Sequence, residues 1–247
     1  MSVAEKAADE RPITKGFAKN EWKLREEIVA RCRELNERGI NQGTSGNISA
    51  RCGEGFLISP SAFPYELMQP EHVVPMRFDG SWEGKLKPSS EWRFHLDILA
   101  ARPEVQAVIH AHPMYCTTVA ILGHDIPPLH YMIAVTGADR VRCAPYATYG
   151  TEELSRNALE ALGTSNACLL ANHGVIVTGG NLAGAMWLLV EVETLAQQYF
   201  HTLQLGGPVL LTPAQMQAVR DKMMGGYGGA KGAEKKSEKK TDEKKGA

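Results

Sequence analysis

Residues 105–112 place two histidines at the end of one strongly apolar segment. The run from 105 to 110 is rich in valine and isoleucine, which is typical of a buried β-strand. Side chains two residues apart on a strand point to the same face of the sheet, so His110 and His112 can bind one ion together. The segment therefore predicts both a buried strand and two ligands of a metal site.

A third histidine completes the predicted site. His173 lies in an Asn-His-Gly turn between two short apolar runs, 167–171 and 174–178, which we predict to be strands. Three imidazole ligands without a cysteine leave coordination positions open, which is typical of a catalytic metal rather than a structural one. Zn²⁺ suits such a site best, and Mn²⁺, Fe²⁺ or Co²⁺ would also fit. The other histidines are interpreted as structural, namely His72, His95, His124, His130 and His201.

Length, charge and cysteine usage exclude several classes of protein. The chain has 247 residues, enough for one large domain or two small ones, and its net charge of −1 does not indicate nucleic-acid binding. We find no segment typical of a membrane helix or a signal peptide, so we expect a cytoplasmic protein that binds no membrane. The five cysteines are widely spaced and odd in number, and we expect buried, reduced thiols.

Helical and strand-like segments follow one another without regular alternation. Helical spacing predicts helices at about 20–38, from 89 to just before Pro103, at 114–122 and at 181–205. Additional strands are predicted at 48–51 and 56–59, joined by a turn. This mixture predicts an α/β fold, with a single domain whose central, largely antiparallel sheet is flanked by helices.

The two ends of the chain differ from its body. Residues 1–18 are polar and are expected to form a flexible segment, and the domain is assigned to residues 19–228. Residues 229–247 are predicted to be a disordered, lysine-rich tail, because the stretch 231–247 has seven lysines, four acidic residues and almost nothing apolar. We interpret the tail as solvated and assign it no nucleic-acid partner.

Two further segments are typical of anion-binding sites. The loop 43–47 offers backbone amides that glycine leaves accessible, together with the side chains of Thr44 and Asn47. Ser89 and Ser90 lie at the predicted start of a helix, where free amides and the helix dipole attract phosphate. A plain turn and a plain helix cap would each explain one segment. Beside a three-histidine site, however, the two together favour a phosphate ligand.

Glu91 directly follows the second of these segments. A glutamate in the first turn of a helix commonly balances the helix dipole. Between a phosphate anchor and a metal, it is also suited to carry a proton next to a metal-polarised carbonyl. A phosphate at one end and a metal at the other predict a short phosphorylated ketose as the substrate.

Seven stretches of the sequence resemble the class II aldolase/adducin family, and within it the ketose-1-phosphate aldolases. The resemblance extends from about residue 23 to residue 227, and its motifs are long and specific. The stretches are 35–51 (LNERGINQGTSGNISAR), 88–95 (PSSEWRFH), 108–118 (VIHAHPMYCTT), 126–134 (IPPLHYMIA), 143–155 (CAPYATYGTEELS), 172–174 (NHG) and 185–196 (AMWLLVEVETLA).

The resemblance implies a role for each residue that matches a family motif. Glu91 would be the acid/base and also a ligand of the resting metal. Tyr131 would act on the oxygen at C4 from a neighbouring subunit, and Tyr227 would close over the substrate. The family also implies a homotetramer with active sites between subunits. The implied zinc ligands are His110, His112 and His173, and the implied phosphate contacts are Thr44, Asn47, Ser89 and Ser90.

The implied reaction is the zinc-dependent retro-aldol cleavage of a ketose 1-phosphate to dihydroxyacetone phosphate and an aldehyde. Tyr131 would take the proton of the C4 hydroxyl group, and Glu91 would return a proton to C3. Because the metal stabilises the negative charge, no lysine Schiff base is needed. Lys85 and Lys87 are therefore interpreted as exposed loop charges.

The sequence departs from the family pattern near the substrate. Ser61 and Ala62 stand where the family enzymes carry a Thr-Gly pair, and Tyr149 stands where a phenylalanine is usual. The glycine-rich segment around Tyr227 lacks the basic residue that follows this tyrosine in the family. These changes leave the metal chemistry intact but leave the aldehyde open. The resemblance implies L-fuculose 1-phosphate as the substrate, with 5-deoxyribulose or 5-methylthioribulose 1-phosphate as alternatives.

Two kinds of rival function remain open on the same scaffold, one enzymatic and one non-catalytic. A pentulose-phosphate 4-epimerase would break and re-form the same bond, and a methylthioribulose-phosphate dehydratase would eliminate water. A non-catalytic, adducin-like domain would bind partners through its lysine-rich tail. Domains of that last kind lack the metal histidines, which this chain retains.

Overall fold

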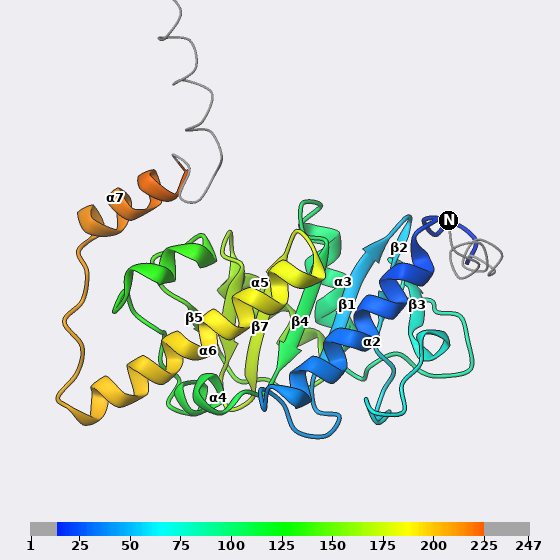
Figure 1. Ribbon diagram of the computed structural model, residues 1–247, viewed down its shortest axis with the longest axis horizontal. Helices are drawn as coiled ribbons and strands as arrows, with labels where there is room; N and C mark the ends of the chain where they lie inside the picture. Colours follow the sequence, from blue (N-terminus) through cyan, green and yellow to red (C-terminus); the bar gives the residue numbers. More distant parts are fainter. Residues whose placement is uncertain (1–13, 225–247) are drawn as a thin grey trace, which may run out of the picture.

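Seven strands form one sheet in the computed structural model, which describes residues 14–224 (Figure 1). They are β1 (Asn47–Cys52), β2 (Gly55–Ile58), β3 (Val74–Arg77), β4 (Ala107–Ala111), β5 (Arg142–Ala144), β6 (Ala167–Leu170) and β7 (Gly174–Gly179). The strand order is β3-β2-β1-β4-β7-β6-β5. All neighbouring pairs are antiparallel except β5 and β6, which are parallel. The prediction of a single domain with a central, largely antiparallel sheet is confirmed.

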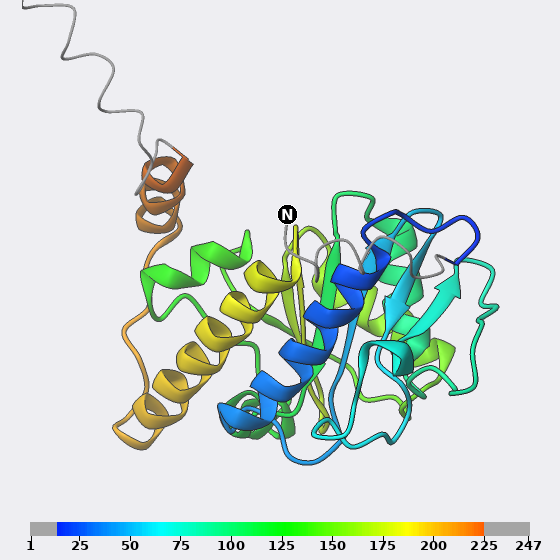
Figure 2. The same ribbon diagram turned by 45° about the vertical axis from the view of Figure 1, so that its right-hand side comes forward.

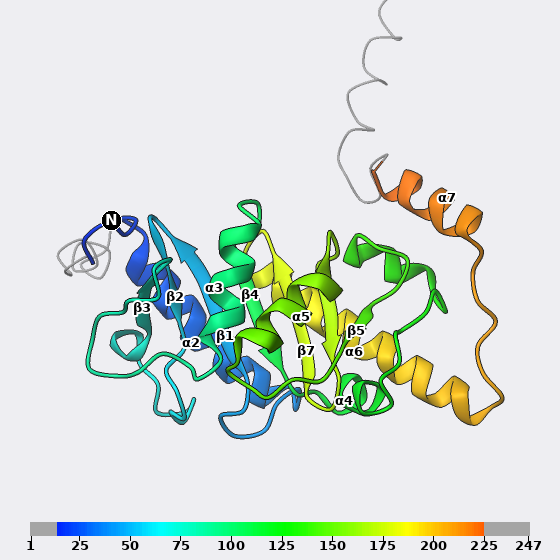
Figure 3. The ribbon, with the colours of Figure 1, turned by 180° about the vertical axis from the view of Figure 1, so that it is seen from behind.

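Helices cover both faces of this sheet. They are α2 (Glu21–Glu37), α3 (Trp92–Ala101), α4 (Met114–Ile121), α5 (Glu152–Leu162), α6 (Leu182–Gln204) and α7 (Pro213–Met224), with short 3-10 turns η1 (Pro70–His72) and η2 (Tyr131–Thr136). Helices α2 and α6 cross the face seen in Figure 1, and α3 and α5 cover the opposite face, seen in Figure 3. None of the helices between residues 14 and 224 is both long and apolar enough to cross a membrane.

Side chains of β4 belong to two hydrophobic cores, because they alternate between the two faces of the sheet. Ala107, Ile109 and Ala111 are completely buried in the core beneath α2, α4 and α6. Val108 is buried in the second core, beneath α3 and α5. His110 follows Val108 by two residues, and its ring lies edge-on to Phe94 of α3, at 5.4 Å between ring centroids. The same alternation that builds the cores therefore directs this histidine toward the start of α3.

The helix predicted to begin at Ser89 begins at Trp92 instead, and neither serine caps it. Glu91 occupies the N-cap position, and its backbone N–H donates to Ser89 Oγ at 3.3 Å. The segment before the helix is extended because it pairs with the loop after β2, where Ser89 N donates to the carbonyl oxygen of Ser59 at 3.0 Å. The predicted serine cap was therefore wrong, since a tertiary hydrogen bond holds Ser89 outside the helix and Glu91 takes the N-cap position.

The remaining predicted elements agree with the structure within a few residues, but two strands, two α-helices and both 3-10 turns were not predicted. Strands β3 and β5 are short and lie at the two edges of the sheet, where a periodic pattern has little length to develop. Helix α5 did have a usable signal, because Thr151 accepts a hydrogen bond from Leu154 N at 3.2 Å as an ordinary N-cap. Helix α7 was also missed.

Helix α7 stands apart from the main body and contacts it mainly through η2 (Figure 2). An ion pair between Arg220 and Asp139 joins α7 to the loop after η2. The predicted tail at 229–247, Tyr227 and most of the predicted segment 1–18 lie outside the described residues.

Candidate metal centre

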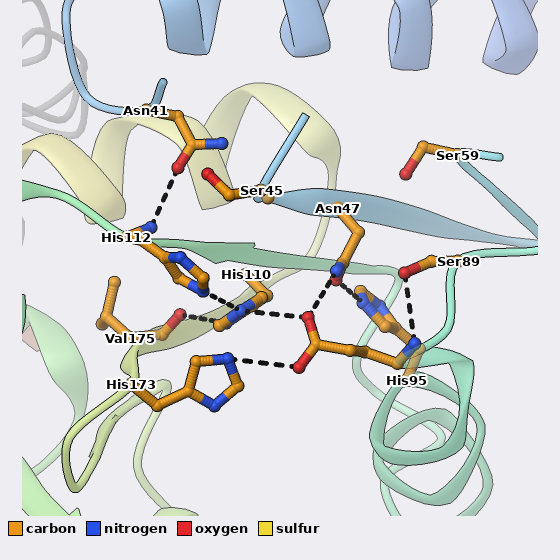
Figure 4. Close-up of polar contacts among 12 residues, drawn as sticks. Asn41, Ser45, Asn47, Ser59, Ser89, His95, His110, His112, His173 and Val175 are labelled. Carbon is orange, nitrogen blue, oxygen red and sulfur yellow. Dashed lines mark hydrogen bonds and ion pairs between the residues drawn. The ribbon is translucent and has the colours of Figure 1, made fainter. Parts of the chain in front are cut away.

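Three histidines and one glutamate converge beside the end of β4 (Figure 4). One ligand atom of each residue lies within 4.8 Å of the others. His110 Nε2 is 2.9 Å from His112 Nε2, and Glu91 Oε2 is 3.3 Å from His110 Nε2. Glu91 Oε1 is 3.2 Å from His173 Nε2. The structure thus brings together the four residues proposed from the sequence, although they come from β4, the residue after it, the β6–β7 turn and the start of α3.

The donor set and its spacing fit a divalent cation. In a tetrahedral zinc site with bonds of about 2.1 Å, the ligand atoms are about 3.4 Å apart, close to the separations found here. His110 Nδ1 faces the carbonyl oxygen of Val175 at 3.0 Å. A carbonyl group only accepts, so Nδ1 carries the proton and Nε2 presents its lone pair to the cluster. Glu91 Oε1 is buried and accepts no hydrogen bond, which is expected of an atom that awaits a cation.

Electrostatics favour the deprotonated forms that a metal requires. Burial alone would raise the pKa of Glu91, but the positive charge that His110 and His173 carry when protonated outweighs it and holds that pKa well below its usual range. Burial lowers the pKa of His112 to about 3, and the neighbouring His110 adds to the effect. At neutral pH Glu91 is therefore a carboxylate and His112 a neutral imidazole, the forms that bind metal.

Gly174 allows the turn that carries His173 to approach the end of β4. A Cβ atom at this position would overlap the carbonyl oxygen of Ala111 and lie 2.8 Å from His112 Cδ2. Asn172, in the same turn, has a φ of 55°, a left-handed conformation that asparagine tolerates better than most residues. Asn172 and Gly174 therefore suit the geometry of the turn, and His173 between them supplies the ligand atom.

Two side chains, the buried Asn41 and the half-buried Glu193, fix the backbone at His112 and at the start of α4. The backbone N–H of His112 donates to Asn41 Oδ1 at 3.0 Å. Glu193, in the middle of α6, accepts the N–H groups of Tyr115 and Cys116 at 2.8 Å each, at the start of α4. This carboxylate caps a helix that has no side-chain cap of its own. Neither Asn41 nor Glu193 was singled out from the sequence.

A cavity of about 390 Å³ opens beside the four converging residues. Its walls include all four residues proposed to bind phosphate, which are Thr44, Asn47, Ser89 and Ser90, together with Glu91, His112 and His173. Its other walls include Ser61, Ala62, Tyr146, Tyr149 and Asn172. The departures from the family pattern at Ser61, Ala62 and Tyr149 therefore line the same cavity. Ala62 adopts a φ of 50°, which suits the glycine of the family pattern better than alanine.

Tyr131 does not lie in this cavity. Its side chain is 43% exposed, and it lines a separate hollow with Val219, Lys222 and Met223 of α7. A single chain therefore does not bring Tyr131 to the metal-ligand group. Tyr227 lies outside the described residues.

His95 was interpreted as structural, yet it contacts a residue of the site. Its ring is completely buried, and its Nε2 lies 2.5 Å from Asn47 Oδ1. The sequence held a signal for this contact, because His95 follows Glu91 by four residues and the two lie on one side of the start of α3. Composition alone does not distinguish such a histidine from one that only fills the core.

Comparison with known proteins agrees with this geometry. Residues 26–200 match the family model for the Class II Aldolase and Adducin N-terminal domain. The chain is 47% identical over 199 residues to 5-methylthioribulose-1-phosphate/5-deoxyribulose-1-phosphate aldolase of Rhodospirillum rubrum, covering 81% of this chain and 90% of the relative. It is 45% identical over 201 residues to L-fuculose phosphate aldolase of Escherichia coli K12, covering 81% and 94%. A solved L-fuculose 1-phosphate aldolase superposes with a TM-score of 0.81 at 36% identity, covering 85% of this chain and 100% of the other.

Proposed function

Because this chain belongs to the class II aldolase and adducin family, we propose that it catalyses zinc-dependent retro-aldol cleavage of a ketose 1-phosphate. The products are dihydroxyacetone phosphate and an aldehyde. The observation that carries the proposal is the convergence of Glu91 and three histidines at one cavity, whose walls also hold the four residues proposed to bind phosphate. Relatives that are named as aldolases of L-fuculose phosphate and of two 5-substituted ribulose 1-phosphates support this substrate class.

The phosphate group is proposed to bind at the end of the cavity formed by the loop before β1 and the segment before α3. Thr44, Ser89 and Ser90 offer hydroxyl groups there, and Asn47 offers an amide N–H. The loop also supplies backbone amides around Gly46. A cavity of about 390 Å³ is large enough for a phosphorylated sugar. These contacts anchor one end of the substrate, so that its carbonyl group extends toward the histidines.

The metal is proposed to bind at His110, His112 and His173, with Glu91 as a further ligand when no substrate is bound. A divalent cation held there supplies Lewis-acid polarisation of the C2 carbonyl group. We propose zinc because three imidazole nitrogens and one carboxylate oxygen are ligands that it prefers, with Mn²⁺, Co²⁺ and Fe²⁺ as alternatives.

Two side chains are proposed to move the protons. Tyr131 takes the proton of the C4 hydroxyl group, the C3–C4 bond breaks, and the aldehyde departs. The electron pair of that bond remains on C3 and is delocalised onto the C2 oxygen. Glu91 takes up a proton from solvent once the substrate has bound and donates it to C3, and in the condensation direction it removes the same proton. Its position before α3, 3.2 and 3.3 Å from two imidazoles, supports this role beside the reacting carbon.

Tyr131 is proposed to act in the site of a neighbouring subunit of a homotetramer. Its exposure of 43% and its position away from its own cavity support this assignment. The test combines Tyr131→Phe with His112→Ala, two variants that we expect to be inactive when each is present alone. In mixed tetramers, about a quarter of the sites would pair an intact metal group with an intact tyrosine, and activity returns in that proportion. No recovery in confirmed mixed tetramers would contradict the assignment.

The cytoplasm is the proposed location of the enzyme. The five cysteines are free and four of them are buried, in line with a reducing compartment. Cell fractionation of the native host with an antibody against the chain tests this location.

A substrate panel tests the proposed reaction. Retro-aldol turnover is followed by coupled reduction of dihydroxyacetone phosphate, with the 1-phosphates of fuculose, rhamnulose, ribulose, 5-deoxyribulose and 5-methylthioribulose as substrates. Comparison of kcat/KM across the panel identifies the preferred aldehyde. Dialysis against a chelator should abolish turnover, added zinc should restore it, and His112→Ala should lack it. Full speed without metal, or an amine adduct trapped by borohydride, would overturn the proposal, and elimination of water without cleavage would indicate the dehydratase.

A further inference from the structure

A chain of hydrogen bonds leads from β1 through His95 and Asn47 to Glu91. Figure 4 labels Asn47 and His95, its two middle members. Ser49 Oγ lies 2.7 Å from His95 Nδ1, and His95 Nε2 lies 2.5 Å from Asn47 Oδ1. Asn47 Nδ2 donates to Glu91 Oε2 at 2.9 Å. All four side chains are buried, with exposures between 0 and 6%. None of these hydrogen bonds was expected from the sequence.

The proton positions along this chain follow from what each group can donate. A carboxylate only accepts, so the Asn47 atom that faces Glu91 must be the amide nitrogen. The amide oxygen therefore faces His95, and His95 Nε2 must carry a proton to donate to it. In the neutral ring Nδ1 is then bare and accepts the Ser49 hydroxyl proton. A single neutral tautomer satisfies every contact.

The surroundings of His95 hold the ring in this state. Burial lowers the pKa of His95 to about 3, so the ring is neutral at pH 7. The ring stacks on Phe94, at 4.8 Å between centroids, and no part of it reaches solvent. A turned ring would leave buried polar atoms without hydrogen-bond partners.

We propose that His95 is a positioning residue for the aldol reaction, because it holds the amide nitrogen of Asn47 toward the Glu91 carboxylate. This inference rests on the function proposed above. If the Asn47 amide were turned over, its oxygen would face the carboxylate oxygen across 2.9 Å, and the two acceptors would repel each other. Glu91 would then move from the position at which it serves C3. The second amide hydrogen of Asn47 remains available to the substrate, so both roles of Asn47 are compatible.

Two substitutions of His95 separate hydrogen bonding from space filling. In His95→Gln, the amide nitrogen reaches about the position of Nε2 and can still donate to Asn47. In His95→Asn, the shorter side chain reaches only the position of Nδ1, so it keeps the contact with Ser49 and loses the one with Asn47. His72→Gln is the matched control, because His72 lies in η1, outside the cavity that Glu91 lines.

The assay isolates the proton transfer assigned to Glu91. Zinc-loaded enzyme is incubated with dihydroxyacetone phosphate in D₂O, and exchange of the C3 hydrogen is followed by NMR without any aldehyde. We expect His95→Asn to lower the kcat for exchange and for cleavage by about 10- to 100-fold, with KM and zinc content unchanged. His95→Gln should recover to within about threefold of the wild type, and His72→Gln should match it.

The outcomes separate this inference from the proposed function. A wild-type enzyme without exchange or cleavage would overturn the function, and the inference with it. If the wild type is active and His95→Asn reacts at the same rate, only the inference about His95 is overturned. Equal losses of rate in His95→Asn and His95→Gln would also overturn it. If His95→Asn does not fold, Ser49→Ala replaces it, since loss of the partner of Nδ1 should slow exchange severalfold, and a wild-type rate would refute the inference.

An independent readout needs no activity. In ¹⁵N-labelled, metal-free protein at pH 7, the imidazole signals of His95 should show a protonated Nε2 and a bare Nδ1. The opposite tautomer, or a charged ring, would overturn the inference.

Discussion

Replacement of Gly174 by alanine tests how closely the His173 turn must approach β4. The added Cβ would lie 2.8 Å from His112 Cδ2 and would overlap the carbonyl oxygen of Ala111. Nonbonded carbon atoms prefer separations of about 3.5 Å or more, so the overlap with His112 is about 0.7 Å. Ala111 pairs with Val175 across the β4–β7 ladder, so its oxygen cannot swing aside. The turn and the end of β4 must therefore separate by nearly that distance.

This separation should lower both the folding stability and the metal affinity of Gly174→Ala. Overpacking of a close contact costs about 1–3 kcal/mol of folding free energy. Separation also moves His112 away from His173, and the two lie only 4.9 Å apart between ring centroids. Misplacement of a ligand or its support typically costs about 10- to 100-fold in metal affinity. We therefore expect both a lower melting temperature and weaker zinc binding in Gly174→Ala.

Gly180→Ala is the matched control for this substitution. A Cβ at Gly180 would meet no atom within 4 Å, and Gly180 follows directly after the same strand, β7. The dissociation constant for zinc is measured by competition with a chromophoric chelator, and stability by thermal unfolding of the metal-free protein. Wild-type values for Gly174→Ala in both measurements would refute the reasoning, since they would mean that the turn has room for a side chain.

Three further predictions concern stability. Ala62→Gly should stabilise the fold by about 0.5–1 kcal/mol in urea unfolding, because φ at Ala62 is 50°, and a loss would show that alanine is not strained there. Glu193→Gln should lower the free energy of unfolding by about 1–2 kcal/mol, because α4 loses a charged cap. Glu191→Gln, two residues earlier on α6, should change it little. Equal losses in the two variants would contradict the cap. Metal-free protein should lose stability as the pH falls from about 6.5 toward 4, because His95 and His112 have pKa values of about 3 when folded, and the unfolded chain then binds more protons. His95→Gln should make the free energy of unfolding less dependent on pH, by up to about 1.4 kcal/mol per pH unit in this range. An unchanged pH dependence would contradict the burial of a neutral ring.

The two longest helices could be predicted from their pattern, and the short strands at the two edges of the sheet could not. Helices α2 and α6 bury an apolar stripe over many residues, so the pattern identifies them from the sequence alone. Strands β3 and β5 have only four and three residues, and their order in the sheet depends on pairing that no local pattern records. The start of α3 was misplaced because hydrogen bonds from a distant loop, and not a local cap, decide where it begins.

The sequence alone determined which residue types could form the metal group, because two histidines at strand spacing and a histidine in a glycine-containing turn restrict the chemistry to an open nitrogen site. Only the tertiary structure decided how these groups meet, because the separations of about 3 Å depend on β4 pairing with β7 and on a close approach at Gly174. It also decided that Tyr131 lies outside its own cavity and that His95 reaches Asn47. Such relations join residues distant in sequence, and their energies come from packing and burial that the local sequence does not specify.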